Sequence, residues 1–297
     1  MLRRVIIVMA GALALLLGGH GLLPDLNGFT PVLESLLPWL GLGVPILLVG
    51  ALVSRSGKAA LAVLLLPGLV WAVMFGPDLL RTAPGGPSDL FVATLNVGVV
   101  NNNSGRAVRA VAKDRDLFAA QELTPGGPAA RELDQIFPYK AQVSTIGLWS
   151  RHPIVEQRRV DIGLAWTRAL RAVVKTPKGK LTVYVMHLAS ARPGATAKRD
   201  DTLDHARRLI DRDPSEHLLL LGDLNTATTD RKRSDLVPPL LDAQQEAGGG
   251  FGFTWPSSFP ITRPDHILYR GLTATSAGVE EAAGSDHRAA VATLRLK

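Results

Sequence analysis

Three stretches near the start of the chain contain no charged side chain, and each is long enough to cross a membrane. They span residues 5–24, 35–54 and 59–77. About 20 helical residues cross the hydrocarbon core of a bilayer, because each residue of a helix adds about 1.5 Å. We therefore predict a membrane anchor over residues 1–80 that contains three transmembrane helices.

The first stretch has an alternative interpretation as a cleaved signal peptide. Arg3 and Arg4 precede it, as basic residues precede the apolar region of a secretory signal. However, the sequence Pro24-Asp25-Leu26 that follows lacks the small residues of a cleavage site, and two further apolar stretches come after it. The pattern favours a retained anchor.

The charges beside these stretches predict how the anchor is oriented. Basic residues precede the first stretch and connect the second to the third: Arg3, Arg4, Arg55 and Lys58. The connection between the first two carries only Asp25 and Glu34. Because Lys and Arg are retained in the cytoplasm, we predict a multi-pass protein of the cytoplasmic membrane with its N-terminus inside. Three spans would then place the remainder of the chain outside the cytoplasm.

Composition limits the chemistry that is available. The chain contains no cysteine, so it forms neither disulfides nor thiolate metal sites, and any bound metal must use oxygen and nitrogen ligands. Its formal net charge is +7. This surplus weakly favours a polyanionic substrate or an anionic lipid surface, although a solvated basic surface explains it almost as well.

A turn-rich segment separates the apolar region from the rest of the chain. Residues 81–88 are rich in Pro and Gly, which predicts a linker followed by a soluble domain over 89–297. In this domain, short apolar runs rich in Val and Leu alternate with polar helical stretches. Strands are predicted at 90–97, 117–121, 181–187, 217–221, 266–269 and 289–296, and helices at 106–113 and 198–212. The predicted fold class is α/β.

Polar side chains follow several of the predicted strands at the point where each strand ends. These residues are Asn96, Glu122, His187, Asp223 and Asn225. Strand ends are held rigidly by a sheet and open to a cleft, so the repeated pattern suggests one shared site. Some of these residues also have simpler explanations, because Asn96 could cap a turn, and Asp223 with Asn225 could form an Asx turn.

The soluble domain carries an ordered series of short motifs. They are Thr-Leu-Asn at 94–96, Gln-Glu-Leu-Thr at 121–124, Trp-Ser-Arg-His-Pro-Ile at 149–154, Met-His-Leu at 186–188, Gly-Asp-Leu-Asn at 222–225, Arg-Pro-Asp-His-Ile at 263–267 and Ser-Asp-His at 285–287. Each motif alone is weak, but the ordered set is specific. In these motifs the domain resembles the endonuclease/exonuclease/phosphatase superfamily, which includes DNase I-like endonucleases, repair exonucleases, neutral sphingomyelinases and inositol polyphosphate phosphatases. The resemblance implies a four-layer α/β/β/α sandwich.

The same resemblance implies a divalent-metal site built from oxygen ligands. By similarity, Glu122 is a metal ligand, with Asn96 and Asp286 beside the metal. Asp223 and Asn225 would position water and phosphate oxygens. Oxygen ligands suit Mg²⁺, with Mn²⁺ as the alternative, and a cation neutralises the charge that develops during phosphoester hydrolysis.

Two pairs of histidine and aspartate are also implied by the resemblance. His287, oriented by Asp286, would contact phosphate or serve as base, and His187, paired with Asp265, would assist the leaving group. A carboxylate beside an imidazole orients the ring and raises its pKa, which makes proton transfer near neutral pH feasible. The sequence leaves open whether Asp223 or His287 takes the proton from water.

Basic residues near the motifs are candidates for phosphate binding. Arg151, Arg192 and Arg263 are predicted to contact the substrate. Two basic loops, at residues 192–199 and 231–233, could bind phosphates that flank the scissile one, or could simply be solvated.

Aromatic residues occur at two places where lipid contact is conceivable. Trp39 and Trp71 lie near the ends of apolar stretches, where indole suits the membrane interface, although ordinary packing explains them equally well. Phe251, Phe253 and Trp255 lie in a Gly-rich segment and could stack on a base, touch lipid or pack in the core of the domain.

The combination of an anchor with an exported domain resembles a bacterial subgroup of the superfamily that includes membrane proteins associated with glycopeptide (teicoplanin/vancomycin) resistance. We therefore expect a Mg²⁺-dependent phosphoesterase that hydrolyses phosphate mono- or diesters of lipid-linked or other cell-envelope substrates. Tethering favours a substrate in the membrane over free nucleic acid. The expected partners are the phosphoester substrate and the lipid bilayer, and nothing in the sequence indicates a protein partner.

Two other functions remain as hypotheses. An extracellular nuclease that acts on DNA or RNA is the first, although the sequence has no counterpart of the active-site tyrosine of the repair nucleases. The second is a non-catalytic envelope module that uses the same cleft to bind anionic ligands.

Overall fold

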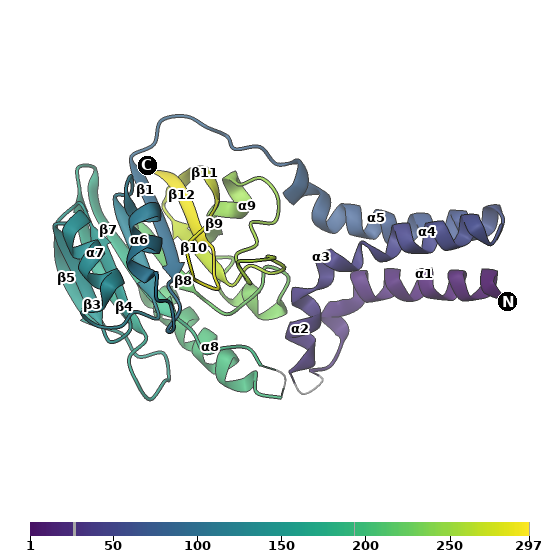
Figure 1. Cartoon of the computed structure of the whole chain (residues 1–297), viewed down its shortest axis with the longest axis horizontal. Helices are drawn as coiled ribbons and strands as arrows, with labels where there is room; N and C mark the ends of the chain where they lie inside the picture. The colour runs from purple at the N-terminus through teal and green to yellow at the C-terminus, as the bar shows by residue number, and fades with distance from the viewer. Residues whose placement is uncertain (26–27, 193, 297) are drawn as a thin grey trace.

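The computed structural model describes residues 1–25, 28–192 and 194–296, and these form two parts. A bundle of helices extends from one side of a two-sheet domain, with the N-terminus at the far end of the bundle (Figure 1). Residues 81–88, predicted as a linker, form neither helix nor strand and lead from the bundle into the domain.

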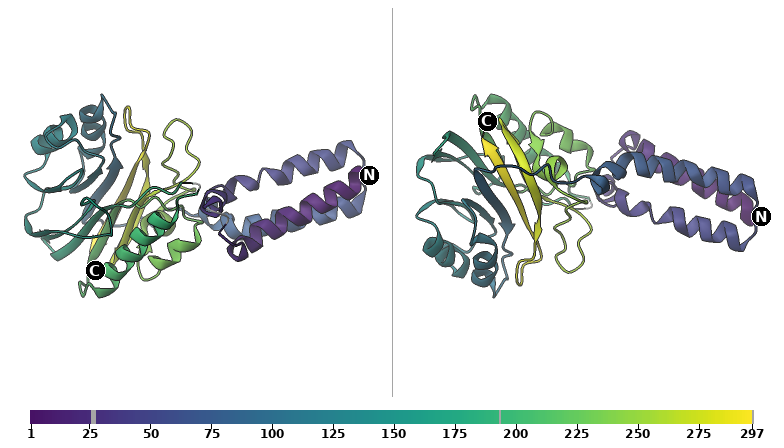
Figure 2. Two further views of the ribbon diagram at one scale, coloured as in Figure 1. Left: turned by 90° about the horizontal axis from the view of Figure 1, so that it is seen from below. Right: turned by 90° about the horizontal axis from the view of Figure 1, so that it is seen from above.

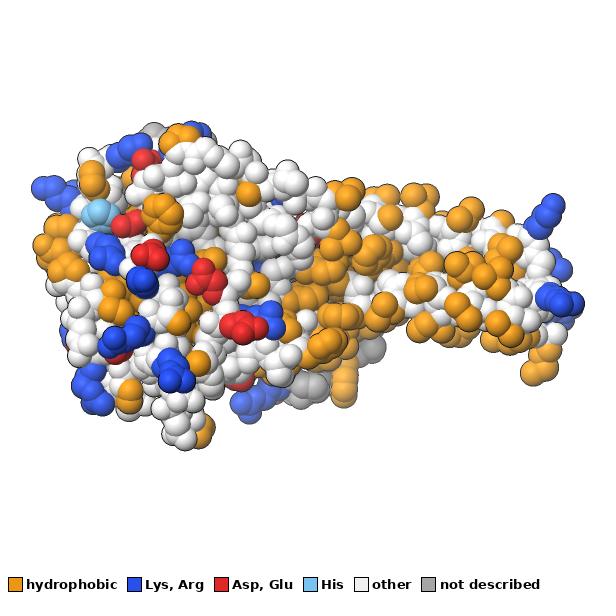
Figure 3. All heavy atoms as spheres, turned by 45° about the horizontal axis from the view of Figure 1, so that its top comes forward, with side chains coloured by type: hydrophobic (Ala, Val, Ile, Leu, Met, Phe, Trp, Pro, Cys, Tyr) orange, Lys and Arg blue, Asp and Glu red, His pale blue; other side chains and the backbone are white. Residues whose placement is uncertain are grey.

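Helices of the bundle lie side by side (Figure 2). They are α1 (Leu2–Gly19), α4 (Gly43–Val53) and α5 (Lys58–Leu80). Ala10, Ala51 and Ala60 are buried where these helices meet, because a methyl side chain lets helix backbones approach closely. Larger apolar side chains point outward and cover the bundle surface (Figure 3). Helices that are apolar on all sides are typical of a lipid environment.

Two continuous helices of the described chain, Leu2–Leu22 and Lys58–Leu80, are long and apolar enough to cross a membrane. Between them, α2 (Phe29–Ser35) and α3 (Leu37–Leu40) precede α4. The predicted middle span over 35–54 is therefore not one straight helix, and the chain bends by 62° after α2. Pro38 and Gly41 explain the irregularity, since proline lacks an N–H and glycine disfavours helix. The three predicted spans correspond to two continuous helices and one bent pair.

In the described residues, the strands of the domain form two six-stranded sheets. The first has the order β11 (Leu272–Glu280), β12 (Ala289–Leu296), β1 (Leu90–Asn96), β2 (Leu117–Gln121), β4 (Ile146–Ser150) and β3 (Tyr139–Val143). The second has the order β5 (Ile154–Arg159), β6 (Ala169–Thr176), β7 (Gly179–His187), β8 (Leu218–Asp223), β10 (Asp265–Arg270) and β9 (Leu241–Asp242).

Helices cover the outer face of each sheet. On the first sheet lie α6 (Ser104–Ala112) and α7 (Pro128–Ile136), and on the second lies α8 (Ala197–Arg212). A short helix, α9 (Ala243–Ala247), and a 3-10 turn, η2 (Arg231–Asp235), complete the connections near β9. This arrangement of two packed sheets with helices outside confirms the predicted α/β sandwich.

Strand periodicity explains how each sheet is buried on both faces. Successive side chains of a strand point to opposite faces. In β7, Val183 and Val185 enter the core between the sheets, while Tyr184 and Met186 pack against α8. Strands buried on both faces need continuous apolar runs, which is why β7 and β8 were visible in the sequence.

One parallel pair of strands lies in the middle of each sheet. β1 and β2 are joined by the crossover helix α6, and β7 and β8 are joined by α8. The other pairs in the described sheets are antiparallel. Two parallel strands end at the same edge of their sheet, so each pair delivers the residues after its strands to one place.

Buried polar contacts join the bundle to the domain. Glu34, in α2, is fully buried and accepts hydrogen bonds from Nε of Arg231 at 2.7 Å and from its backbone N–H at 3.1 Å. Arg231 also donates to the carbonyl oxygens of Leu23 at 2.6 Å and His20 at 2.9 Å. A segment of the anchor is thereby fixed to η2.

We expect Glu34→Ala to lower the free energy of unfolding of the full chain by about 1–3 kcal/mol, because the donors of Arg231 lose their acceptor in a partly buried place. Thermal unfolding in detergent micelles measures this change. Glu132→Ala is the control, because Glu132 pairs with the exposed Arg109 and its loss should remove less than about 1 kcal/mol. An equal effect of both substitutions would contradict the structural role of Glu34.

Candidate active site

The two parallel strand pairs bring four of the predicted residues together. Asn96 and Glu122 follow β1 and β2 in the first sheet, and His187 and Asp223 end β7 and β8 in the second. Nδ2 of Asn96 donates to Oδ2 of Asp223 at 3.0 Å, which joins the two sheets. Nε2 of His187 lies 3.8 Å from Oε1 of Glu122 and 3.6 Å from Oδ2 of Asp223. The strand-end residues therefore form one site.

Asp265 and His287 complete the buried part of this site. Strand β10 runs antiparallel to β8 and places Asp265 opposite Asp223. Nδ1 of His287 lies 2.8 Å from Oδ2 of Asp265, which also accepts a hydrogen bond from Thr254 at 2.6 Å. Asp265 is thus paired with His287, whereas the sequence prediction paired it with His187. The order of residues along the chain does not reveal this pairing, because it depends on which strand lies beside β8.

Asp286, predicted to orient His287, is not the carboxylate that pairs with the imidazole of His287. Its carboxylate is exposed and accepts a hydrogen bond from Nε1 of Trp255 at 3.3 Å. In a Ser-Asp-His sequence the neighbouring side chains diverge, and here the imidazole turns inward while the carboxylate faces the rim. The serine, Ser285, is buried and donates to the carbonyl oxygen of Asn96 at 2.7 Å, so this loop is held against β1.

The two histidines are held in opposite protonation states. Burial lowers the pKa of His187 to about 4, with Arg168 and His287 acting in the same direction. Burial also opposes protonation of His287, but the charge and hydrogen bond of Asp265 outweigh it and raise its pKa to about 10. Burial, together with the neighbouring carboxylate of Asp265, raises the pKa of Asp223. At neutral pH the site therefore holds one neutral and one protonated imidazole.

Backbone geometry around the site is unusual at two of its functional residues. Glu122 has φ +56° and Asn225 has φ +48°, a backbone conformation that residues other than Gly rarely adopt. Such conformations occur preferentially at functional sites, where the surrounding structure holds them. Gly222 has φ +144°, and a Cβ there would come within 1.9 Å of the carbonyl oxygen of Met186, so only glycine fits before Asp223.

Asn225 does form an Asx-type turn with Asp223, as the simpler interpretation proposed. Its backbone N–H donates to Oδ1 of Asp223 at 2.9 Å, and its Nδ2 donates to the carbonyl oxygen of Leu188 at 3.0 Å. The turn leaves Oδ2 of Asp223 to face Asn96 and the histidines. Structural and functional interpretations of this motif are therefore compatible.

The residues predicted to bind a metal surround one short segment of backbone. Oδ1 of Asn96 accepts from the N–H of Gly98 at 3.1 Å, and Oε2 of Glu122 accepts from the N–H of Val99 at 3.1 Å. A Cβ at Gly98 would come within 3.4 Å of Oδ1 of Asp286. The atoms that Asn96, Glu122 and Asp286 offer as metal ligands are all oxygen, which fits Mg²⁺ or Mn²⁺.

A second group could also hold a metal ion. Ligand atoms of Asp223, Asp265 and His287 lie within 4.8 Å of one another among the described residues. Nδ1 of His287 and Oδ2 of Asp265 already share a hydrogen bond, however, which these two atoms would have to exchange for bonds to the metal. The oxygen set around Glu122 stays the predicted metal site.

Arg151, predicted to contact the substrate, lies at the opposite end of the sheet from Glu122. It follows β4, which runs antiparallel to β2, so its backbone N–H donates to the carbonyl oxygen of Asp116, before β2 begins. Its guanidinium donates to the carbonyl oxygens of Lys113 and Arg115 and lies over the ring of Phe137. Glu122 lies at the other end of β2.

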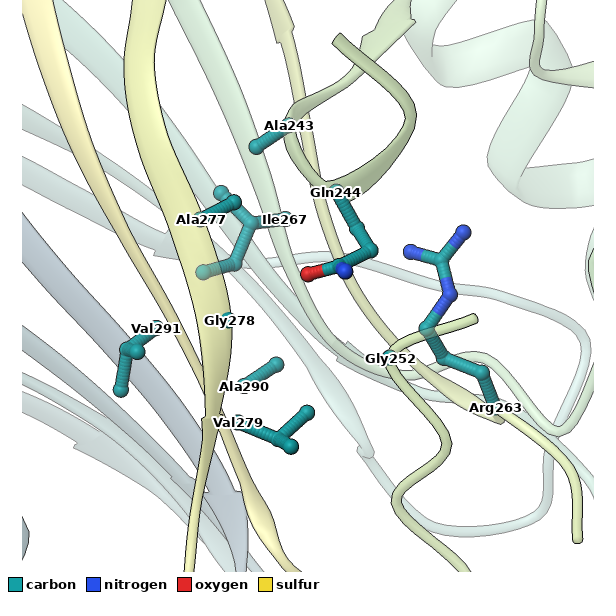
Figure 4. A pocket seen from close by; sticks show the side chains of 10 residues that line it. All are labelled: Ala243, Gln244, Gly252, Arg263, Ile267, Ala277, Gly278, Val279, Ala290 and Val291. Atoms are coloured by element: carbon teal, nitrogen blue, oxygen red, sulfur yellow. The ribbon is translucent and has the colours of Figure 1, made fainter. Parts of the chain in front are cut away.

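Arg263, also predicted to contact the substrate, has a partner inside the protein. It is buried, and its Nη1 donates to Oδ1 of the fully buried Asp242 at 2.8 Å. Figure 4 shows it beside Gln244 at a hollow of about 10 Å³, which has room for about one water molecule and none for a phosphate. Arg192 is exposed on the loop after β7 and stays a prediction.

Several other basic residues of the two predicted loops have structural partners. Arg199 is buried in an ion pair with Asp230, and Arg233 pairs with Asp242 at 2.7 Å. Arg231 is held by Glu34. These guanidinium groups stabilise the loops around the site and are not free to bind a polyanion.

Arg168 is a residue of the site that the sequence did not indicate. Its carbonyl oxygen accepts from the N–H of His187 at 2.9 Å, and its Nη2 donates to the carbonyl oxygen of Leu188 at 3.0 Å. Burial lowers its pKa, and the nearby charges of Asp223 and Glu122 act against that effect. Arg168 lies outside every motif, before β6, and only the pairing of β6 with β7 places it beside the site.

Comparisons with known proteins point to one family. The family model described as "Endonuclease/Exonuclease/phosphatase family" matches residues 93–287, which include every residue of the buried site described above. No curated protein is a match to the chain.

Solved structures share the fold of the domain. TDP2 of D. rerio, complexed with a single-strand DNA product, is 19% identical, with a TM-score of 0.60 over 69% of this chain and 98% of that one. A mannosyl-6-phosphatase of Bacteroides thetaiotaomicron is 17% identical, with a TM-score of 0.55 over 69% and 99%. Sphingomyelinase C of Streptomyces griseocarneus is 16% identical, with a TM-score of 0.52 over 70% and 99%.

At these identities the likeness shows the fold alone, and the family model supplies the assignment. The model spans both crossover helices, strand β10 with Asp265, and the loop that carries His287. This chain belongs to the endonuclease/exonuclease/phosphatase family.

Proposed function

We propose that this chain is a phosphoesterase of the cytoplasmic membrane that depends on Mg²⁺ or Mn²⁺. Its catalytic domain lies outside the cytoplasm and hydrolyses phosphate mono- or diesters of lipid-linked or other cell-envelope substrates. The family supports the hydrolase class. Similar structures include one named a mannosyl-6-phosphatase and one named a sphingomyelinase, which is compatible with either kind of ester. The resemblance to the glycopeptide-resistance subgroup belongs to the same proposal.

The observation that carries the proposal is that the anchor supports the loops of the site. Gly28 lies so close to the loop after β7 that a Cβ would come within 2.9 Å of Cγ2 of Thr196. Glu34 holds η2, which follows the Asp223 motif, and Nε1 of Trp39 donates to the carbonyl oxygen of Ile261 at 2.9 Å, just before β10. A site built against a membrane anchor faces substrates at the membrane surface.

Charge at the two ends of the bundle supports the proposed orientation. The far end, where α1 begins and where α4 is connected to α5, carries the basic residues Arg3, Arg4, Arg55 and Lys58 (Figure 3). The end beside the domain carries Asp25 and Glu34. Positive flanks are retained in the cytoplasm, so the domain belongs on the opposite side.

The carboxylate partners of the basic loop residues favour a single phosphate over a nucleic acid. A protein that tracks a nucleic acid neutralises several phosphates with unpaired Lys and Arg side chains. Here Arg199, Arg231 and Arg233 are taken up by carboxylates. Arg168 and the protonated His287 remain beside the buried carboxylates, and they suffice for one phosphate.

Different residues of the site would bind the cation and activate the attacking water. Glu122, Asn96 and Asp286 would hold the divalent cation, which when bound supplies charge stabilisation for the phosphate oxygens. Asp223 would orient the attacking water and accept its proton, a role that suits a buried carboxylate with a raised pKa. Asn225 keeps Asp223 in position through its backbone N–H.

The histidines have separate parts in this scheme. Asp265 holds Nδ1 of His287, so that its protonated Nε2, which lies 3.9 Å from Oδ2 of Asp223, faces the phosphate as a hydrogen-bond donor. His187 is neutral, and with the ring held between Glu122 and Asp223 its Nε2–H would donate a hydrogen bond to the leaving oxygen. Arg168, beside His187, adds positive charge on the same side.

We expect Glu122→Gln to lower kcat/KM for bis-p-nitrophenyl phosphate by about 100-fold or more, because a ligand charge is lost at equal size. EDTA should abolish the wild-type activity, and Mg²⁺ or Mn²⁺ should restore it. Calorimetric titration with Mn²⁺ should show weaker binding to the variant. Glu132→Gln, in an exposed ion pair, is the control, and full activity of Glu122→Gln would refute the metal assignment.

The pairing of Asp265 with His287 predicts non-additive substitutions. Asp265→Asn and His287→Asn should each reduce kcat by about 100-fold or more, and the double variant should be little worse than either, since paired residues act as a unit. His187→Asn combined with Asp265→Asn should instead show independent losses. Double-mutant cycles of kcat values measure the coupling in the two pairs. Coupling of Asp265 to His187 and not to His287 would contradict the pairing seen in the structure and support the one predicted from the sequence.

Arg168→Met should lower kcat/KM by roughly tenfold to a hundredfold, because a cation beside the reacting phosphate is lost while the aliphatic stem is kept. Arg151→Met is the matched control, because Arg151 lies at the other end of β2, and it should retain wild-type kcat/KM. A loss of kcat/KM in Arg151→Met but not in Arg168→Met would instead indicate that Arg151 contacts the substrate.

A further inference from the structure

An apolar hollow of about 370 Å³ lies at the junction of the anchor and the catalytic domain. Its walls include Trp39, Gly41, Leu42, Trp71, Phe251 and Phe253. None of these side chains is charged, and the size falls within the range of about 300–1,000 Å³ that is typical of ligand pockets. The active-site residues do not line it, so the mechanism leaves this hollow without a role.

The hollow is continuous with the lipid-facing surface of the bundle. Leu42 caps the start of α4 and is 57% exposed, and Ile46, one turn further along α4, is 68% exposed. Trp39 and Trp71 lie where the bundle meets the domain, the level at which indole rings are found in membranes. In an anchored protein, the medium that reaches this opening is hydrocarbon and head group.

A ridge of aromatic side chains leads from the hollow to the active site. The ring of Trp39 lies 5.9 Å from that of Phe253 and 5.7 Å from that of Phe259, which is exposed. Trp255 is also exposed and donates to Asp286 at 3.3 Å. Thr254, between Phe253 and Trp255, donates to Asp265. Consecutive residues are about 3.8 Å apart, so the hollow and the site lie within the reach of one lipid molecule.

We propose that this hollow binds the hydrocarbon chain of the substrate, an acyl or isoprenyl chain of a membrane lipid that carries the scissile phosphoester. The chain enters between Leu42 and Trp71, the head group passes along Phe259 and Trp255, and the phosphate reaches Asp223. This inference rests on the proposed function, since it names how a membrane substrate is selected. It also assigns Phe251 and Phe253 a part in recognising lipid.

The test uses the full chain in phosphatidylcholine nanodiscs and two synthetic diesters that share one leaving group, hexadecyl p-nitrophenyl phosphate and methyl p-nitrophenyl phosphate. Leu42→Trp fills the hollow. Leu52→Trp is the matched control, because Leu52 has the same 57% exposure near the other end of α4. We expect the ratio of kcat/KM values, hexadecyl over methyl, to fall about tenfold or more in Leu42→Trp and to stay at the wild-type value in Leu52→Trp.

A second measurement does not depend on activity. A hexadecyl phosphate with a diazirine near the end of its chain is irradiated with the wild-type protein, and the labelled peptides are identified by mass spectrometry. Labelling concentrated on residues 38–42 and 251–253, and reduced in Leu42→Trp, supports the proposal. Labelling spread evenly over α1, α4 and α5 overturns it.

The outcomes separate this inference from the proposed function. Suppose that both esters are hydrolysed, that the ratio is the same in the two variants and that labelling is even. This result would refute lipid binding in the hollow and would still support the proposed phosphoesterase activity. Hydrolysis of neither ester would argue against the proposed function, and the labelling pattern would still decide whether the hollow binds a lipid chain.

Discussion

The hydrogen bond between Asn96 and Asp223 is the contact on which the rest of the site depends. The two side chains are buried and come from different sheets. Apolar packing between the sheets is strong but not directional, so by itself it leaves the strand ends free to shift. A hydrogen bond between two buried groups is directional, and leaving either group unsatisfied costs about 1–3 kcal/mol. This contact therefore sets the distance between the two halves of the cleft.

The two histidines beside that contact differ in protonation. Both lie near the carboxylate of Asp223, yet His187 is neutral and His287 is protonated at neutral pH. The difference arises because only His287 has a carboxylate, Asp265, in hydrogen-bond contact, while His187 lies beside Arg168. Environments that push the pKa values of two similar groups apart are typical of sites that both accept and donate protons.

The helical bundle is part of the scaffold that supports the two-sheet domain. Arg231 is bound by Glu34 and by carbonyl oxygens of the segment that follows α1. Trp39 stacks on Phe253 and donates to Ile261, on the segment that precedes β10. Because these contacts involve buried groups, the domain is held in a fixed direction relative to the bundle. The active site and the apolar hollow are therefore both held in a fixed position relative to the bundle.

Much of the fold could be read from the sequence where the signal is local. The apolar stretches, the strands buried on both faces and the polar residues at their ends depend on neighbours in the chain, so they are visible without a structure. Other elements were missed for physical reasons. Strand β5 is mostly exposed and reads Ile-Val-Glu-Gln-Arg-Arg, without an apolar alternation, and α7 is a short helix after a turn.

The sequence alone determined that the chain has an apolar N-terminal region, an α/β domain and a set of acidic, amide and imidazole groups at strand ends. Only the tertiary structure decided which of these groups meet. It paired Asp265 with His287, moved Arg151 and Arg263 out of the site and brought Arg168 into it. The reason is that strand order and register set the distances between residues far apart in the chain, and no local pattern encodes them.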